Sequence, residues 1–582
     1  MINNILNIIE NNKKYQIAIF LIVLTTLSTF TIYRYSFADT ITPGDDSEFH
    51  YYRLLALMKS LKDGSFPIYI NNDALLQYGY AARWFYSDFI LIPFAALANI
   101  IGVVKAYTVM FFTMSMLCGI LTYISVNKVY KNRMAAFITA ILYTFCLYRL
   151  QDLYDRSALS EAFSFTFVPL AFWGLYEIIK GDYKKWYIIS IGFCLLIFTH
   201  VIATLLVFIT SIIIIIIYYK DLRQEPKRLL YLILSGMVCV LLSAYFLFPF
   251  FEQISSNSFY FEEGRMFAIN FGRAKDDLIR IPTQNVLVGM LSIALPKITN
   301  LHFLPAIGLT LTFGIFLRFF IHEKDQKIKS IDIFVVLALV YIAFSFDTLP
   351  SFFYVKKFFS TIQFTWRLYE ISSFFLALAG GYYLSLLLQK NIRSVAALIC
   401  LLGCVVLLIT VNSTYYKYTR EKPKTISSQN IIIDKNSIAG LGLAEYLPIK
   451  VPSIEFIQDR NILLKTNNIE TVTNNFERKN RATIFNVIVN KPDIIELPLI
   501  YYKGYSAKLN NEQITITESE NGLIEIPINQ SGKVHVEFTG TLIQKYSFYV
   551  TVISILLFCI YIFWYNRKNK NINKTNHVNT II

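Results

Sequence analysis

The chain has 582 residues, of which 55% are hydrophobic and 16% charged, and its formal net charge is +15. Long apolar runs with so few charges are typical of integral membrane proteins and exclude a soluble chain. The lysines and arginines form short clusters between the apolar runs, as the positive-inside rule predicts, so the net charge does not indicate nucleic-acid binding.

A span length of about 20 residues predicts about twelve transmembrane helices. They lie at 15–36, 107–127, 134–150, 161–179, 186–199, 201–219, 229–250, 302–320, 331–347, 370–389, 393–412 and 546–566. With both termini cytoplasmic, each inner turn is basic: Lys13 and Lys14, Lys128 to Arg133, Lys180 to Lys185, Lys220 to Arg228, Lys324 to Lys329, Lys390 to Arg393, and the tail from Arg567. The first span has too long an apolar core for a signal peptide, so we expect it to stay as an anchor.

One apolar stretch, 88–104, is not counted as a crossing, because a crossing there would place Lys128 and Arg133 outside. It is short and contains Pro93 and Gly102. We expect a helix that lies on or dips into the outer leaflet and shapes a lipid-facing cavity.

The predicted fold class is a polytopic α-helical membrane protein with a small extracytoplasmic β-rich domain before its last helix. Its parts are a transmembrane domain at 1–412 with an outer loop at 37–106, the β-rich domain at 413–545, the last helix at 546–566, and a basic cytoplasmic tail at 567–582. Strand-like stretches are Ala482 to Val489, Gln513 to Thr517, Leu523 to Ile528 and Lys533 to Phe538, while 424–440 and 465–480 are expected to be surface loops.

The first outer loop carries an acidic pair, Asp45 and Asp46, followed by His50. Pro43 and Gly44 break the backbone before the acids, and helical periodicity follows, so the pair is expected at a helix N-terminus. The helix dipole and the free amide groups there help to keep carboxylates ionised. The alternative is simple N-capping, for which one aspartate is enough.

A second polar cluster precedes the span at 161–179. Asp152 and Arg156 are four residues apart, and Glu161 stands at the very start of an apolar helix, where a charge is costly unless it has a partner or faces a wet cavity. We expect Asp155, Arg156 and Glu161 to reach the same outer surface as the acidic pair. The alternative is snorkelling or capping at the membrane interface.

Two further residues point to this surface. His200 lies at the outer tip between the spans 186–199 and 201–219, and Arg367 follows Trp366 at the outer boundary, where its planar fork suits a lipid phosphate. The alternatives are an ordinary helix-turn histidine and an arginine that pairs with Glu370 or anchors the interface.

An outer acidic pair, a juxtamembrane helix, a basic inner turn and an outer Asp-Arg-Ser-x-x-x-Glu together resemble the GT-C superfamily of polyprenyl-phosphate-sugar-dependent membrane glycosyltransferases. More narrowly, the order of short motifs is similar to the bacterial YfhO-like and "6-pyruvoyl-tetrahydropterin synthase-related" membrane proteins. The motifs are Gly44-Asp45-Asp46, Leu61 to Pro67, Gln363 to Arg367, Glu445 to Pro448 and Tyr501 to Ala507. No soluble zinc-histidine site of a pterin synthase is present in the sequence.

The resemblance implies inverting transfer of a sugar from a polyprenyl-phosphate donor to an extracytoplasmic cell-envelope acceptor. It places Asp45 or Asp46 as the base, and Asp155 and Glu161 near the sugar or a metal. Arg367, or Arg156, would stabilise the donor phosphate. The expected catalytic residues are Asp45, Asp46 and Glu161, and the expected substrate-binding residues are His50, Asp155, Arg156, His200 and Arg367. Mg²⁺ or Mn²⁺ held by Asp45, Asp155 and Glu161 is left open.

Twelve crossings with charged outer loops also suit a transporter or flippase of lipid-linked glycans, although few ionisable residues lie near the span centres. A third reading is an inactive scaffold whose outer domain binds wall polymer. Richness in Ile, Asn and Lys indicates an AT-rich bacterial genome and therefore the plasma membrane.

Overall fold

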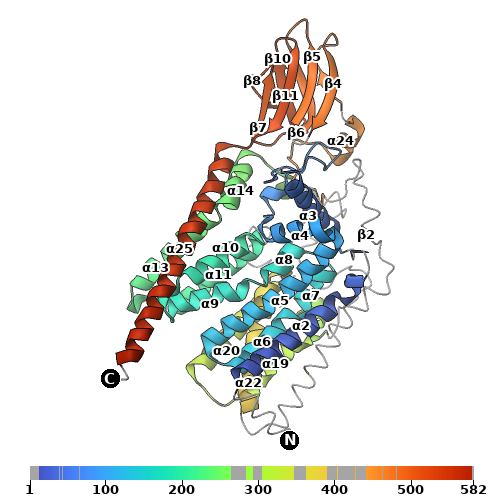
Figure 1. Cartoon of the computed structure of the whole chain (residues 1–582). Coiled ribbons are helices and arrows are strands. Elements are labelled where there is room, and N and C mark those ends of the chain that lie inside the picture. Colours follow the sequence, from blue (N-terminus) through green and yellow to red (C-terminus); the bar gives the residue numbers. More distant parts are fainter. Residues whose placement is uncertain are drawn as a thin grey trace.

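The computed structural model describes residues 12–37, 40–41, 44–64, 66–263, 283–292, 305–346, 362–389, 403, 426–427, 441–442, 444–461, 463–479 and 482–579. Helices make up most of this part of the chain. A small β-rich unit stands at one end of the helical body, as Figure 1 shows. The mainly helical membrane architecture with a β-rich region near the C-terminus is therefore confirmed.

Six helices in the described residues are long and apolar enough to cross a membrane. They are α2 (Lys13–Phe37), α5 (Val103–Tyr130), α6 with α7 (Arg133–Thr144 and Leu147–Tyr154), α8 with α9 (Leu159–Ser164 and Val168–Ile179), η5 with α22 (Thr365–Leu368 and Tyr369–Gln389), and α25 (Leu542–Asn579). A seventh crossing results if α13 (Lys227–Leu242) and α14 (Ala244–Ser256), which meet at an angle of 77°, form one broken span.

The predicted count of twelve crossings is not confirmed. The hairpin expected at 186–219 consists of α10 (Tyr187–Ile197) and α11 (Val201–Ile217), with 11 and 17 residues. An 11-residue helix rises only about 16 Å, roughly half of a hydrocarbon core. Farther along, α19 continues into η4 (Leu309–Phe316 and Leu317–Phe320), and α20 (Gln326–Phe344) has 19 residues but begins with polar turns. The span predicted at 393–412 lies outside the described residues, apart from Gly403.

Shorter elements connect these helices. They are η3 (Tyr183–Lys185), α12 (Tyr219–Gln224), α15 (Tyr260–Glu263), α18 (Thr283–Leu291), α24 (Ile454–Arg460) and the strand pair β1 (Thr40–Ile41) with β2 (Ile426–Ser427).

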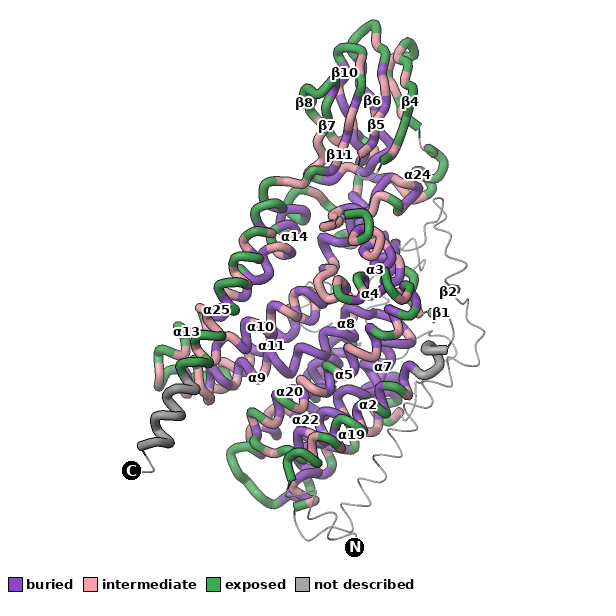
Figure 2. Tube along the Cα trace, in the orientation of Figure 1, coloured by how far each residue is buried: buried purple, intermediate pink, exposed green. Residues whose placement is uncertain are grey.

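Burial separates an inner set of helices from an outer set. In η5 with α22, 89% of the most apolar window is buried, whereas α25 has 17%. Figure 2 shows the same contrast, with buried α22 inside the bundle and exposed α25 and α13 along its flank. The exposed residues of α25 include Leu556, Leu557 and Ile560, at 59%, 63% and 64% exposure. Such an apolar outer surface fits hydrocarbon rather than water.

The described basic turns gather at one end of the bundle. The end of α5 and the start of α20 meet there, since Lys327 donates to the carbonyl of Tyr130 at 3.0 Å, and Arg133 at the start of α6 donates to Gln16 of α2 at 3.2 Å. The tail of α25 reaches the same end, where Tyr565 contacts Asp182 at 3.3 Å. This is the arrangement that the alternating basic turns predict.

At the other end, α3 (Ser47–Lys62) is followed by η1 (Ala82–Trp84), η2 (Phe89–Leu91) and α4 (Ile92–Ile101). The apolar helix formed by η2 and α4 ends before Gly102, which has a φ of +88° and starts α5. The stretch predicted not to cross is thus a short helix, packed against α3 and α5.

A buried ion cluster fixes this segment. Arg53 contacts Asp88 at 3.1 Å, Arg83 contacts the other oxygen of Asp88, and Arg83 also donates to the carbonyl of Arg53 at 3.0 Å. Because one carboxylate balances two buried guanidiniums, α3 cannot shift without unpairing a charge.

The β-rich unit is a two-sheet sandwich within the described residues. One sheet has the order β3-β6-β10-β9 and the other β4-β5-β11-β7-β8. Phe485 and Val534 of one sheet share a buried core with Ile495 and Ile526 of the other. The strands are β3 (Lys465–Thr466), β4 (Val472–Lys479), β5 (Ala482–Ile488), β6 (Asp493–Ile500), β7 (Tyr505–Leu509), β8 (Glu512–Ile514), β9 (Thr517–Glu518), β10 (Leu523–Ile528) and β11 (Gly532–Phe538).

The four predicted strands are found, but the stretch at 513–517 is divided between β8 and β9. The surface loop predicted at 465–480 is wrong, because it contains β3 and β4. β4 is an edge strand paired with β5 and mostly exposed, so its sequence carries no apolar alternation.

The sandwich is tied to the membrane part by polar contacts. Gln253 at the end of α14 donates to the carbonyl of Lys503 at 3.1 Å, and Glu252 accepts from Thr541 before α25 at 2.7 Å. On the loop before η1, the carbonyl of Tyr78 accepts from the amide of Ile500 at 3.0 Å.

We expect Asp88→Asn to destabilise the protein by about 3–5 kcal/mol, because it leaves Arg53 and Arg83 buried without an anion. Asp73→Asn is the matched control, since Asp73 contacts Lys59 at 3.5 Å in an exposed pair that contributes about 0–1 kcal/mol. Thermal unfolding in detergent measures both, and equal midpoints for the two variants would contradict the structural role of Asp88.

Candidate functional site

Asp46 is the N-cap residue of α3, as predicted, but its side chain makes no capping hydrogen bond. The hydroxyl of Ser47 instead contacts the amide and the carbonyl of Gly44, at 3.0 and 2.9 Å. Simple capping therefore does not account for the Asp46 carboxylate. Asp46 is half-buried, whereas Asp45 is exposed.

The first outer loop docks on the turn between α7 and α8 through its backbone. The amide of Asp46 donates to the carbonyl of Arg156 at 2.8 Å, and the amide of Asp45 lies 3.4 Å from the carbonyl of Asp155. The approach is very close at Gly44, where a Cβ atom would lie 2.2 Å from the Ser157 hydroxyl. Two polar motifs that are far apart in the sequence are thus joined directly.

The carboxylate of Glu161, at the start of α8, anchors two arginines. Its Oε2 atom lies 3.0 Å from Nη1 of Arg156 and 3.2 Å from Nε of Arg367, and its Oε1 atom accepts from the hydroxyl of Tyr148. Glu161 is 2% exposed and each arginine 6%. A charge at this depth is stable only with such partners.

Both guanidinium groups of this cluster also lie by the Phe364 ring, at 5.9 Å for Arg156 and 5.3 Å for Arg367. Arg367 donates from Nη1 to the carbonyl of Ile362 at 3.0 Å and to the side chain of Gln363 at 2.8 Å. Its Nη2 atom has no hydrogen-bond partner among the described residues. That nitrogen is a donor that a bound anion could use.

Several members of the cluster did not stand out as site residues in the sequence. Asp152 pairs with Arg156 at 2.7 Å, and the four-residue spacing in the sequence indicated this contact. No sequence pattern indicated that Tyr148 or Phe364 would join the cluster. Arg367 does not pair with Glu370 as the alternative expected; Glu370 accepts instead from Ser164 at 2.6 Å.

Two histidines border the cluster. Nδ1 of His50 lies 3.1 Å from the Arg53 guanidinium, and Nδ1 of His200 accepts from the amide of Ala203 at 3.4 Å. An arginine and a backbone amide can only donate, so both neutral rings carry their proton on Nε2. Burial, with Arg367 nearby, lowers the pKa of His200 to about 3, and burial with Arg53 holds the pKa of His50 well below its usual range.

The electrostatic surroundings of Asp46 favour proton transfer. Loss of hydration raises its pKa above the usual value for aspartate, while the fields of Arg156 and Arg367 oppose that rise and Glu161 adds to it. A carboxylate whose pKa is raised in this way is a stronger base than a solvated one.

The proposed divalent-metal site does not fit these side chains. The described residues contain no group of three His, Cys, Asp or Glu side chains placed to hold a metal ion. Both oxygens of Glu161 already accept hydrogen bonds from Tyr148, Arg156 and Arg367, and two guanidinium groups would repel a cation. We therefore assign no step to Mg²⁺ or Mn²⁺.

The structure brings most predicted site residues to one place. The side chains of Arg156, Glu161 and Arg367 are in contact, and their charges influence the pKa values of Asp46 and His200. The ring of His50 lies near that of His200. Asp45 and Asp155 meet through their backbones.

No protein-family model matches the chain. An uncharacterized protein of Lactococcus lactis subsp. cremoris (strain MG1363) is 25% identical to it, over 95% of this chain and 96% of that protein. Among solved structures, this chain is similar to the arabinofuranosyltransferase AftD from Mycobacteria, with a TM-score of 0.45 and 13% identity over 70% of this chain and 27% of AftD.

A second similar structure is the apo form of the Archaeoglobus fulgidus oligosaccharyltransferase. Its TM-score is 0.34, with 13% identity over 78% of this chain and 60% of the oligosaccharyltransferase. The chain thus spans about a quarter of AftD and three-fifths of the oligosaccharyltransferase. Likenesses at this level establish neither a shared fold nor a shared activity.

We expect Gly44→Ala to destabilise the outer end by about 1–3 kcal/mol, because its Cβ would overlap Ser157. Gly236→Ala in α13 is the control: nothing lies within 4 Å of the added Cβ, so alanine should be neutral or stabilising by up to about 1 kcal/mol. Thermal unfolding tests both, and a Gly44→Ala protein as stable as the parent would argue against close docking of the loop.

Proposed function

We propose that the chain is an inverting membrane glycosyltransferase that moves a sugar from a polyprenyl-phosphate donor to an extracytoplasmic acceptor of the bacterial cell envelope. The observation that supports it most is the placement of the Asp46 carboxylate, which does not cap its helix, in the field of two arginines held by Glu161. The proposal also takes the chain to be a GT-C and YfhO-like protein. It places the chain in the plasma membrane with both termini in the cytoplasm.

In this proposal Asp46 is the general base. The acceptor hydroxyl gives its proton to the Asp46 carboxylate as its oxygen bonds to the anomeric carbon of the sugar, while the bond from that carbon to the donor phosphate breaks. Asp46 is preferred over Asp45 because it is half-buried beside the arginines, whereas Asp45 is exposed. A desolvated carboxylate with a raised pKa accepts a proton more readily.

The departing polyprenyl phosphate needs cations or hydrogen-bond donors. The Nη2 atom of Arg367 can donate a hydrogen bond to the phosphate, and Arg156 contributes positive charge from the other side of Glu161. Charge-assisted hydrogen bonds from a fixed guanidinium suit a phosphate that gains negative charge as the bond breaks. Glu161 in this scheme is a positioning residue rather than a proton carrier, because hydrogen bonds occupy both of its oxygens.

The histidines and Asp155 are assigned to substrate binding. A neutral imidazole with its proton on Nε2 can donate to a sugar hydroxyl without adding charge, and this role suits His50 and His200. Asp155 lies in the turn on which the first outer loop docks. It is therefore close to Asp46, which accepts the proton of the acceptor hydroxyl in this proposal.

The direct test uses the purified protein with a panel of radiolabelled polyprenyl-phosphate sugars. We expect donor consumption by the parent, a loss of at least about 100-fold in Asp46→Asn, and little loss in Asp45→Asn. Because the raised pKa of Asp46 means that its ionised form costs folding free energy above that pKa, Asp46→Asn should unfold at the same or a higher temperature at pH 7. No consumption of any donor, together with passage of lipid-linked glycan across liposomes, would replace the proposal with the flippase function.

The pH profile gives a second test. Asp46 accepts a proton only when it is ionised, so kcat/KM should fall on acidification with an apparent pKa above the usual value of about 3.9 for aspartate. The acid limb should be absent from the residual activity of Asp46→Asn. An unchanged limb in that variant would assign the titration to another group.

Arg367→Gln should weaken donor binding by about 10- to 100-fold, the loss of one or two charge-assisted hydrogen bonds to phosphate. Arg318→Gln is the control, since Arg318 pairs with Asp332 at 2.9 Å near the basic end of α20. Binding of labelled donor by scintillation proximity compares them, and equal affinity of both variants would exclude Arg367 from the phosphate site.

A further inference from the structure

A cavity of about 200 Å³ lies at the basic end of the bundle, away from the Asp46 cluster. Its walls come from the end of α5, α9, the end of α11, the start of α20 and α22. His200 of the Asp46 cluster lies before the start of α11, whereas the cavity residues Ile214 and Tyr218 lie at its end; on α22 the cavity residues Phe374 and Phe375 follow Arg367 by seven and eight residues. Ile214 and Tyr218 of the cavity lie about 20 Å along α11 from His200, so the end of the cavity that carries Lys180 and Lys327 is separate from the Asp46 cluster.

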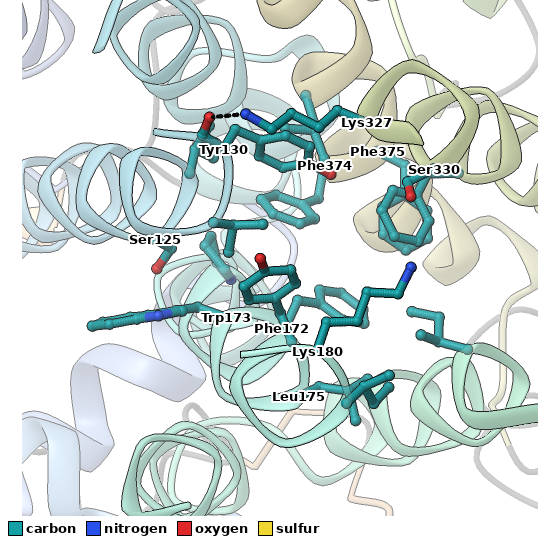
Figure 3. A pocket seen from close by; sticks show the side chains of 18 of the residues that line it. Ser125, Tyr130, Phe172, Trp173, Leu175, Lys180, Lys327, Ser330, Phe374 and Phe375 are labelled. Atoms are coloured by element: carbon teal, nitrogen blue, oxygen red, sulfur yellow. Dashed lines mark hydrogen bonds between the residues drawn. The ribbon is translucent and has the colours of Figure 1, made fainter. Parts of the chain in front are cut away.

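Aromatic and aliphatic side chains form the walls of the cavity, as Figure 3 shows. Phe172 stacks on Phe374 at 5.6 Å, and Phe334 stacks on Phe375 at 4.9 Å. Paired rings of this kind are rigid and apolar, so they favour hydrocarbon over a polar metabolite. The volume is below the 300–1,000 Å³ or so of typical small-molecule pockets and is better matched to part of a single chain.

Two lysines line the same cavity. Lys327 donates to the carbonyl of Tyr130 at 3.0 Å, and the ammonium of Lys180 lies 3.9 Å from the centre of the Tyr218 ring. Neither lysine has an ion-pair partner among the described residues. Each ammonium has three donors, so these contacts orient the two groups and leave donors for an anion.

We propose that this cavity binds an anionic, phosphate-bearing lipid, with a section of its hydrocarbon chain between the aromatic pairs and its phosphate at Lys180 and Lys327. Apolar walls beside unpaired cations match the two halves of such a molecule, whereas a neutral lipid would leave the lysines without a counter-charge. Two sources share this chemistry, namely anionic glycerophospholipids and polyprenyl phosphates. The site does not depend on the proposed glycosyl transfer.

The test places the full chain in nanodiscs of phosphatidylcholine that contain a minor fraction of phosphatidylglycerol or of polyprenyl phosphate. Native mass spectrometry after release then measures which lipid stays bound. We expect one or both anionic lipids to be retained in preference to phosphatidylcholine, and the preferred one identifies the source. Each Lys→Gln change at Lys180 or Lys327 should lower retention roughly fivefold, and the double variant roughly 25-fold.

Lys184→Gln is the matched control, because Lys184 is an exposed lysine in the neighbouring turn η3 and does not line the cavity. It should leave retention unchanged. Equal retention of the anionic lipids and phosphatidylcholine would overturn the proposal, as would losses of similar size in Lys184→Gln and the double variant.

Contact within the cavity has a readout of its own. Trp173 lines the wall, so an anionic lipid with a brominated chain should quench its fluorescence, and Trp173→Phe should remove that part of the quenching. Quenching that is the same in Trp173→Phe, or that persists in the Lys180→Gln/Lys327→Gln protein, would show that the chain does not occupy this site.

Discussion

The contact of one buried carboxylate, Glu161, with two arginines holds the outer end of this protein together. Arg156 comes from the turn just before the helix of Glu161, and Arg367 is 206 residues away. Removing any of the three would leave the buried cluster, which includes Asp152, with a net charge in a low-dielectric interior, which costs several kcal/mol. The turn that carries Arg156 also receives the amide of Asp46. The ion cluster therefore fixes both the helix ends and the acidic loop.

The helices separate two kinds of chemistry. Carboxylates, arginines and histidines meet at the end next to the β-sandwich, whereas lysines and an aromatic cavity lie at the other. A donor with a hydrocarbon chain and a polar head would meet the first end at the membrane boundary. Asp46 and Arg367 lie there, at the end of the bundle that also carries α4, the short apolar helix expected to shape a lipid-facing cavity. This placement is what the proposed glycosyl transfer at a membrane interface requires.

Sequence reasoning predicted that the candidate site residues share one end of the bundle, because apolar spans alternate in direction, and the structure groups their side chains. The predicted spans put Asp46, Glu161 and Arg367 at the same end of the bundle, although their predicted number of twelve is not confirmed. The sequence did not predict which side chains of different helices pair. Local spacing suggested that Arg367 would pair with Glu370, but the carboxylate that it meets belongs to another helix. Spacing identifies neighbours on one helix only, and contacts between helices follow from packing.

The sequence by itself determined the membrane class, the helix start after the acidic pair and strands with clear alternation such as β10 and β11, since these depend on local periodicity and composition. Only the tertiary structure decided where helices break, that β4 is a strand, and that Asp46 is half-buried in the field of two arginines while Asp45 is exposed. The physical reason is that hydration, pairing and edge position depend on which segments meet, and distant segments meet only in the folded chain.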